Sequence, residues 1–270
     1  MAGPHGMRCS LLVFAAALSL TAAARADQVD QGRTVEDAPS WSHAVSTAAR
    51  AGAFLPWTLS ARVGENSVQA AGFGGYDAAR GSARFESFAE ARVWGPLSLR
   101  AGTELADARN ELRPSLGGRL QLLSRERQGL DGSIAIFYRS EGFSEPEGEI
   151  ETVVALGGRV ERTQLLGNLA YGQDAEGNER DGELRAAVLV FVSGGLQLGA
   201  DGRLRCDLGS TAMKLNTARE ATYDLDLGPV AVLSVGPIAL LGHVGSSVVR
   251  HFEARPELGV VALAGLGSAF

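Results

Sequence analysis

Long segments in which apolar and polar side chains alternate dominate the chain from residue 66 to its end. In GLQLGADGRLRCDL (195–208), Leu196, Leu198 and Leu204 fall on one face, whereas Arg203 and Arg205 fall on the other. A period of two separates the faces of a β-strand, but a helix would mix the same residues. The pattern therefore predicts an all-β fold in which each strand has one apolar and one polar face.

The number and length of these segments narrow the fold further. Strands of globular proteins usually have about 5 or 6 residues, whereas a tilted strand that crosses a bilayer needs about 9 to 11. The segments here are long enough to cross, which predicts an antiparallel transmembrane β-barrel of about 12 strands over residues 66–270. We expect strands at 66–76, 80–94, 97–106, 112–123, 130–140, 149–161, 163–173, 182–193, 195–207, 221–235, 237–249 and 257–270.

The connections between segments alternate in length. ERT (161–163), SGG (193–195) and VGP (235–237) are tight, whereas SEGFSEPEGE (140–149) and GQDAEGNERDG (172–182) are long. Short turns on one side and longer loops on the other are typical of barrels that cross an outer membrane. Pro229 lies inside the segment 221–235, where it lacks an amide for the ladder, so we expect a bulge or a strand boundary there.

The N-terminal region has features of an export signal. Arg8 precedes the apolar run LLVFAAALSL (11–20), and the small residues Ala24 and Ala26 surround Arg25. This arrangement predicts a signal peptide over residues 1–26 that is cleaved before Asp27. We expect residues 27–65 to form a flexible leader with a short amphipathic helix near 41–54, which plugs the barrel, rests at its periplasmic mouth or is simply disordered. Residues 55–65 could also hold a further strand.

The charge and residue types exclude several functions. The chain has a formal net charge of −6, which argues against nucleic acid as a partner. His43, His243 and His251 stand at separated positions and no metal-ligand spacing joins them, so we expect no metal site and no cofactor.

The stretch YGQDAEGNERDGE (171–183) could be a calcium loop or a hairpin tip. Asp174, Glu176 and Asn178 have EF-hand spacing, but Glu179 occupies the position that requires glycine. Turn-forming residues favour a hairpin tip. On the long-loop side, an acidic extracellular rim would attract cations, and we expect it to contain Glu145, Glu147, Asp174, Glu176 and Asp181.

The polar faces of the strands should line the lumen, because lipid requires the apolar faces to point outward. Both signs of charge occur in comparable number, which predicts a polar interior without a strong selective field. The lumen-lining residues we expect are Arg84, Glu86, Arg100, Glu104, Arg119, Glu151, Arg159, Asp201, Arg203 and Arg205.

The final strand ends in Phe270, and Ala262, Ala264 and Leu266 share its face. With the signal peptide, the amphipathic strands and the alternating loop lengths, the chain resembles the bacterial outer-membrane β-barrel family. The resemblance is architectural and identifies no subfamily. It implies an outer-membrane location in a Gram-negative bacterium, contact with lipid, and recognition of Phe270 by the barrel assembly machinery.

We therefore expect a porin-like passive channel for small solutes or cations, or a structural surface protein of the envelope. A soluble secreted or periplasmic all-β binding protein is the alternative, and it would pack its apolar faces inward. A third hypothesis is an outer-membrane barrel hydrolase. His243 and Ser247 share one face but lie about 13 Å apart along the strand, too far for a hydrogen bond. We expect no enzymatic activity.

Overall fold

A computed structural model describes residues 55–62, 68–106, 111–140, 148–175, 180–193, 195–209, 221–251 and 254–269. The predicted signal peptide, the 41–54 helix and Phe270 lie outside these residues. Three residues of the predicted acidic rim, Glu145, Glu147 and Glu176, also lie outside them.

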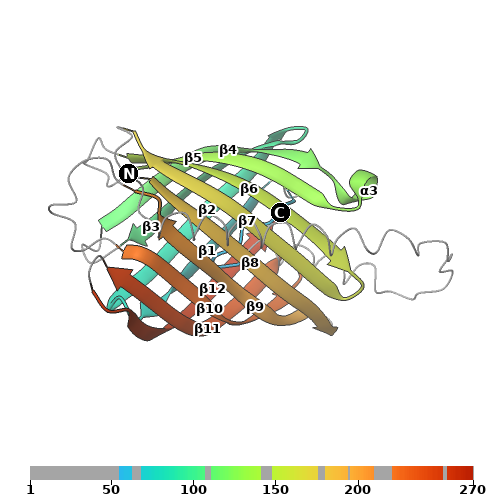
Figure 1. Ribbon diagram of the computed structural model, residues 1–270. Helices are drawn as coiled ribbons and strands as arrows, with labels where there is room; N and C mark the ends of the chain where they lie inside the picture. The colour runs from blue at the N-terminus through green and yellow to red at the C-terminus, as the bar shows by residue number, and fades with distance from the viewer. Residues whose placement is uncertain are drawn as a thin grey trace.

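Twelve antiparallel strands form a closed barrel, in which each strand pairs with its sequence neighbours and β1 closes onto β12 (Figure 1). The predicted fold class and the strand number are confirmed. The strands are β1 (Val68–Asp77), β2 (Ser82–Trp94), β3 (Leu97–Ala106), β4 (Glu111–Leu123), β5 (Asp131–Ser140), β6 (Gly148–Val160), β7 (Thr163–Asp174), β8 (Arg180–Ser193), β9 (Leu196–Asp207), β10 (Ala221–Val235), β11 (Ile238–His251) and β12 (Glu257–Ala269).

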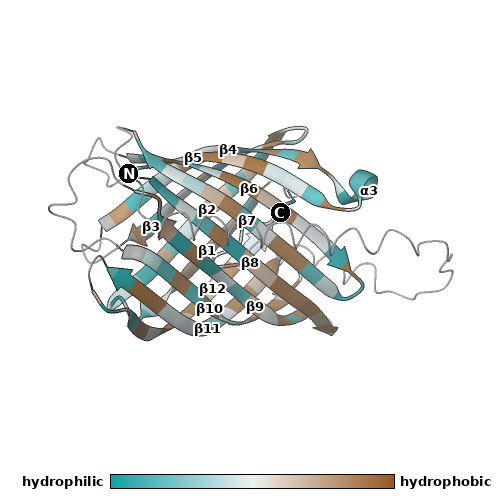
Figure 2. Cartoon of the chain, in the orientation of Figure 1, coloured by the Kyte–Doolittle hydropathy of each residue, from teal (hydrophilic) through white to brown (hydrophobic). Residues whose placement is uncertain are grey.

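The outer surface of the barrel is apolar. Leu116, Val244 and Leu266 are each more than half exposed, while their sequence neighbours point inward, and apolar colour recurs along the strands in Figure 2. A soluble all-β protein would bury such side chains in its core. The outward direction of the apolar faces is what a lipid environment requires.

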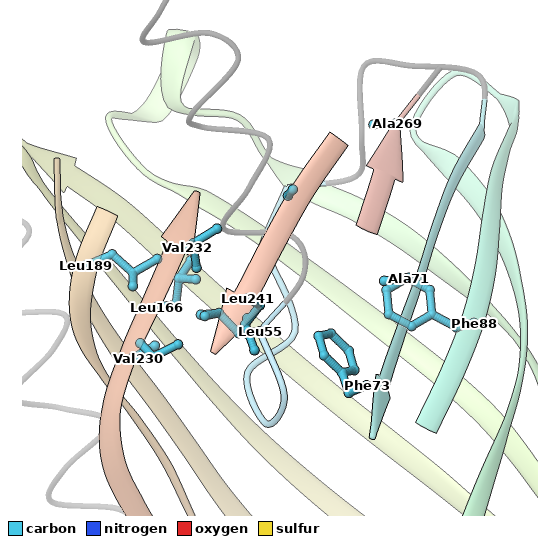
Figure 3. Packing of buried hydrophobic residues seen from close by; sticks show 12 residues of the cluster. Leu55, Ala71, Phe73, Phe88, Leu166, Leu189, Val230, Val232, Leu241 and Ala269 are labelled. Carbon is cyan, nitrogen blue, oxygen red and sulfur yellow. The ribbon is translucent and has the colours of Figure 1, made fainter. Parts of the chain in front are cut away.

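The interior has two levels with different chemistry. Toward the short turns, apolar side chains pack in the lumen beside buried polar ones such as Glu90 and Arg119. Leu55 packs there with Leu189, Val232 and Leu241 (Figure 3). Toward the long loops, the inward positions are mostly charged. We expected a polar interior throughout. The short-turn half also buries apolar side chains, because an internal chain segment packs against them.

Three inward phenylalanines lie beside glycines on the adjacent strand. Phe73 pairs with Gly265, Phe88 with Gly102, and Phe137 with Gly117. A Cβ atom on Gly117 would lie 2.4 Å from the Phe137 ring and 2.2 Å from the Ile136 carbonyl oxygen. Glycine is therefore required for close strand approach there, and the aromatic ring covers the position that lacks a side chain.

Pro229 does not end β10. The Pro229 side chain faces outward. Gly228 and Pro229 have no partner on β11, but β10 and β11 keep the same register before and after these two residues. The missing amide therefore interrupts the pairing without causing the expected bulge. The one register shift between these strands lies at Ala221 and Tyr223.

The short-turn side contains a single turn of helix, α3 (Arg125–Gln128), which connects β4 to β5. Among the residues that the structure describes, no helix is both long and apolar enough to span a membrane.

Candidate functional site

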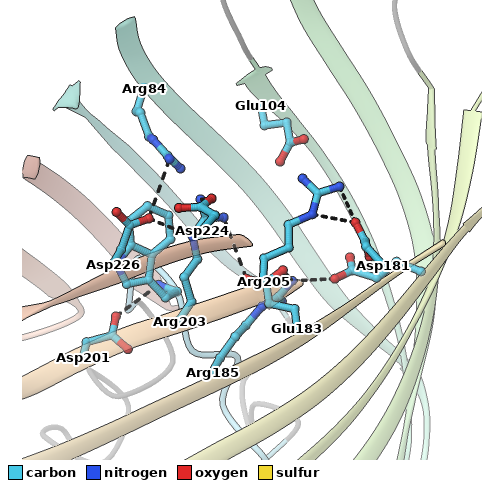
Figure 4. A network of polar contacts seen from close by, with 12 residues as sticks. Arg84, Glu104, Asp181, Glu183, Arg185, Asp201, Arg203, Arg205, Asp224 and Asp226 are labelled. Carbon is cyan, nitrogen blue, oxygen red and sulfur yellow. Dashed lines mark hydrogen bonds and ion pairs between the residues drawn. The ribbon is translucent and has the colours of Figure 1, made fainter. Parts of the chain in front are cut away.

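A band of ion pairs lines much of the lumen in its long-loop half, and we call it the charged belt. Arg139 on β5 lies 3.0 Å from Glu151 on β6, which also pairs with Arg185 on β8. Arg185 is 2.9 Å from Glu183 on the same strand, and Glu183 is 3.8 Å from Arg203 on β9. Acids and arginines therefore alternate around this part of the wall (Figure 4).

The belt continues on β10, β2 and β3. Arg203 lies 2.9 Å from Asp226 on β10, and Asp226 is 3.6 Å from Arg84 on β2. On β3, Arg100 pairs with Glu86, and Glu104 pairs with Arg139. The members of the belt are Asp77, Arg84, Glu86, Arg100, Glu104, Arg139, Glu151, Glu183, Arg185, Arg203, Asp224 and Asp226.

Residues 55–62 lie inside the barrel on the short-turn side of the charged belt, and we call them the internal segment. Thr58 Oγ1 donates a hydrogen bond of 2.6 Å to Asp201 Oδ1, and the Trp57 amide donates to Asp201 Oδ2 at 3.1 Å. Asp201 is fully buried. A carboxylate removed from water needs such donors, so its bonds to the internal segment fix that segment to β9.

Two further inward side chains hold the same segment. Asn168 on β7 accepts from the Leu59 amide at 2.7 Å and donates to the Leu59 carbonyl at 2.9 Å. Arg119 on β4 donates to the Ser60 carbonyl at 2.6 Å and pairs with Glu90 at 2.7 Å. The segment adds no strand to the sheet, because side chains of the wall satisfy its backbone instead of a ladder.

Trp57 connects the internal segment to the charged belt. The guanidinium carbons of Arg84 and Arg203 lie 5.1 Å and 4.4 Å from the indole centroid. His243 meets the same indole edge-on at 6.3 Å between centroids. Cation–π attraction on this side chain therefore links β2 and β9 through the lumen.

A cavity of about 190 Å³ opens on the long-loop side of the internal segment. This volume can hold on the order of ten water molecules. Leu55, Trp57 and Leu59 bound it below, and polar groups dominate its wall. Its charged lining consists of Arg80, Arg84, Glu86, Arg100, Glu104, Arg113, Arg139, Glu149, Glu151, Asp181, Glu183, Arg185, Arg203 and Arg205.

The structure brings most of the expected lumenal residues to this cavity, but it places three elsewhere. Arg119 and Asp201 lie lower and hold the internal segment. Arg159 lies at the short-turn end of β6, where its guanidinium carbon is 4.3 Å from the Phe191 ring centroid. The expected rim residue Asp181 lines the cavity and pairs with Arg205, and Asp174 ends β7 as a half-buried side chain.

His243 and Ser247 do not form a nucleophile–base pair. The Ser247 hydroxyl donates to Asp77 Oδ2 at 3.2 Å, whereas His243 is buried with its ring against Trp57. Within the described residues, no cluster of three or more histidine, cysteine, aspartate or glutamate side chains has the arrangement of a metal site.

At the short-turn rim, the internal segment ends in an ion pair between Arg62 and Glu126 of α3, at 2.9 Å. The pKa of Glu126 is below its usual value, mainly because the Ser124 hydroxyl donates a hydrogen bond to its carboxylate, with a smaller contribution from Arg62. Glu126 is well exposed, so solvent screens this pair and its stabilising effect is small.

Sequence reasoning missed Trp57 and Thr58 as lumenal residues. In the segment FLPWTLSAR (54–62), Leu55, Trp57 and Leu59 alternate with Pro56, Thr58 and Ser60, which is a strand-like pattern, and the segment is rich in apolar residues for a leader. That composition was the available signal that these residues need a buried site.

Solved structures with similar folds are bacterial outer-membrane β-barrels. KdgM porin in complex with disordered oligogalacturonate matches at 10% identity and a TM-score of 0.51, over 75% of this chain and 99% of KdgM. An outer-membrane channel from Pseudomonas putida F1 matches at 9% identity and a TM-score of 0.51, over 80% and 98% of the two chains. LpxR from Salmonella typhimurium matches at 10% identity and a TM-score of 0.49, over 76% and 100%.

No protein-family model and no curated protein matches the chain. At these identities the likeness concerns the fold alone. The fold is that of bacterial outer-membrane β-barrels, which confirms the architectural resemblance, and no subfamily is identified.

Proposed function

We propose that this barrel is a passive outer-membrane channel for small polar solutes and that the internal segment narrows its conduit. The observation that carries the proposal is the cavity of about 190 Å³ in the lumen, bounded by charged wall residues and by the internal segment. A lumen packed throughout by apolar side chains would offer no such polar volume.

The charged belt indicates which solutes would pass. Arginines and carboxylates alternate around the wall and are paired with each other, so their fields largely cancel at the centre of the lumen. We therefore expect weak ion selectivity. Neutral hydroxylated molecules and zwitterions lose hydrogen bonds to water when they enter the lumen. Hydrogen bonds to the charged wall groups would replace them, so the net free-energy cost of entry would be small.

The internal segment would limit conduction. Its bonds to Asp201, Asn168 and Arg119 hold it to three strands of the wall, β9, β7 and β4. Burial of Leu55 and Leu59 adds apolar stabilisation of about 1.5–3 kcal/mol per side chain. Removing the segment should leave the barrel closed, because the ladder does not include it.

Planar-bilayer conductance tests the channel directly. The mature protein should give small, weakly selective conductance steps, and a variant that lacks residues 27–62 should give larger ones. Heat-modifiable migration on a semi-native gel should show that both forms are folded barrels. If neither folded form conducts, the channel proposal fails, and a structural role at the cell surface becomes the better explanation.

We also propose the export route that the sequence indicates. The signal peptide would be cleaved before Asp27, and Phe270 would be read by the barrel assembly machinery of a Gram-negative bacterium. N-terminal sequencing of protein from the outer-membrane fraction tests the cleavage site. Deletion of Phe270 should lower the amount of heat-modifiable barrel, and recovery of the native protein from the soluble periplasm would contradict the membrane location.

We propose that His243 and Ser247 do not act as a hydrolytic pair, and the bond of the Ser247 hydroxyl to Asp77 instead of to the imidazole supports this. Phospholipid or peptide hydrolysis that disappears in His243→Ala would contradict this part of the proposal.

A further inference from the structure

The lipid-facing surface carries charge at only two strand positions within the described part of the chain. Arg180 begins the outward face of β8, and Arg250 lies near the end of β11. Both are exposed, and each is adjacent in sequence to an inward side chain, Asp181 or Val249. A cation on the outside of a barrel is costly at the bilayer centre and is tolerated near an interface.

The tyrosines identify the interface that these arginines occupy. All four tyrosines of the chain lie near the long-loop ends of outward strand faces, at Tyr76, Tyr138, Tyr171 and Tyr223. Tyrosine side chains favour the headgroup level of a bilayer. At the other end of the barrel, Trp94 is 77% exposed. Arg180 and Arg250 therefore lie at the headgroup level of the leaflet around the long loops.

Arg250 lies beside one of these four tyrosines. Arg250 pairs with Tyr223 in the β10–β11 ladder, and its guanidinium carbon is 5.9 Å from the Tyr223 ring centroid. On β8, Arg180 pairs with Gln173, two residues from Tyr171. The two arginines are three strands apart, which corresponds to roughly 14 Å around the wall. One small headgroup cannot bridge that distance.

We propose that Arg180 and Arg250 each bind a phosphate group of an anionic lipid in the leaflet that surrounds the long loops. The guanidinium group offers paired donors that match phosphate oxygens, and it is weakly hydrated, which suits an interface. The outward strand faces provide no carboxylate to compete for either arginine within the described residues. This inference rests on the outer surface of the barrel and does not depend on conduction through its lumen.

Native mass spectrometry of the folded protein, released from nanodiscs of phosphatidylcholine with a minor fraction of phosphatidylglycerol, tests the proposal. The wild-type protein should retain phosphatidylglycerol preferentially. Arg180→Gln and Arg250→Gln should each weaken this preference about fivefold, and the double variant should lose most of it. Arg250→Lys should retain part of it, because charge remains but the paired donors do not.

The matched control is Arg127→Gln in α3, which removes a cation from the short-turn rim. It should leave lipid retention unchanged, and heat-modifiable migration should show that every variant is folded. Equal retention by wild type and the double variant would overturn the proposal. Equal loss in Arg127→Gln, or displacement of the lipid by inorganic phosphate, would also overturn it, because retention would then reflect general charge or free phosphate.

Discussion

The Thr58 hydroxyl donates a hydrogen bond of 2.6 Å to Asp201, a residue 143 positions later in the chain. Both side chains are buried inside the barrel. The contact is therefore a direct link between the segment before the first strand and the lumenal wall of β9. Because the acceptor is a carboxylate, this bond and the one from the Trp57 amide are stronger than bonds between neutral groups.

Replacing Asp201 with alanine should release the internal segment and increase conductance. The change removes acceptors for two donors, and hydrogen bonds to charged groups contribute about 1.5–3 kcal/mol each. Single-channel recording should show larger or more frequent open states. Asp207→Ala is the matched control on the same strand, since Asp207 contacts the Gly209 amide and no residue of the internal segment. Equal conductance in the two variants would contradict a role for this anchor.

Arg119→Met should destabilise the folded barrel by about 3–5 kcal/mol, because the change leaves Glu90 buried without its charged partner. Urea titration in detergent micelles, followed by the heat-modifiable band, measures the free energy of unfolding. Adding Glu90→Gln to Arg119→Met should recover part of the loss. Arg159→Met at the short-turn end is the control and should have a small effect. No recovery in the double variant would show that the lost bond to Ser60 dominates.

The strands could be predicted closely because lipid imposes a strict requirement on alternate residues. Outward Leu116, Val244 and Leu266 must be apolar, and the closed ladder requires long segments without interruption. Strand β3 begins and ends at the predicted residues, and other boundaries shift by at most a few positions. Pro229 was harder to interpret from the sequence. It keeps its pairing with β9 and loses only its pairing with β11, and the register of the strands does not change.

The interior was less predictable, because its contacts join residues far apart in the sequence. Alternation indicates that Asp201 points inward, but it does not indicate whether an arginine or a threonine meets it. Leu189 and Val232 interrupt the polar inner face because the internal segment packs against them. That segment alternates apolar and polar residues as a strand would, so its pattern indicated a further strand and not a segment held inside the barrel.

Gly117→Ala should destabilise the barrel by about 1–3 kcal/mol, since the new methyl group would overlap the Phe137 ring and the Ile136 carbonyl oxygen. Gly118→Ala is a matched control on the next residue, where a Cβ atom meets nothing closer than 3.8 Å. Urea midpoints of the folded band should separate the two variants. Adding Phe137→Ala to Gly117→Ala would relieve the contact with the ring but not the contact with the backbone. Similar midpoints for the two single variants would show that β4 and β5 can separate at this site.

Glu104→Gln should shift the ion preference of the channel toward anions. Glu104 lines the cavity and lies 3.3 Å from Arg139. Without the Glu104 charge, fewer carboxylates offset Arg139, so the wall of the cavity becomes more positive. The reversal potential across a potassium chloride gradient measures the change, and the shift should shrink at high ionic strength because salt screens the field. Glu161→Gln, in the turn between β6 and β7, removes the same charge outside the cavity and should leave the reversal potential unchanged. A shift of equal size in both variants would mean that net protein charge sets the preference, and an unchanged reversal potential in Glu104→Gln would mean that ions do not pass this part of the belt.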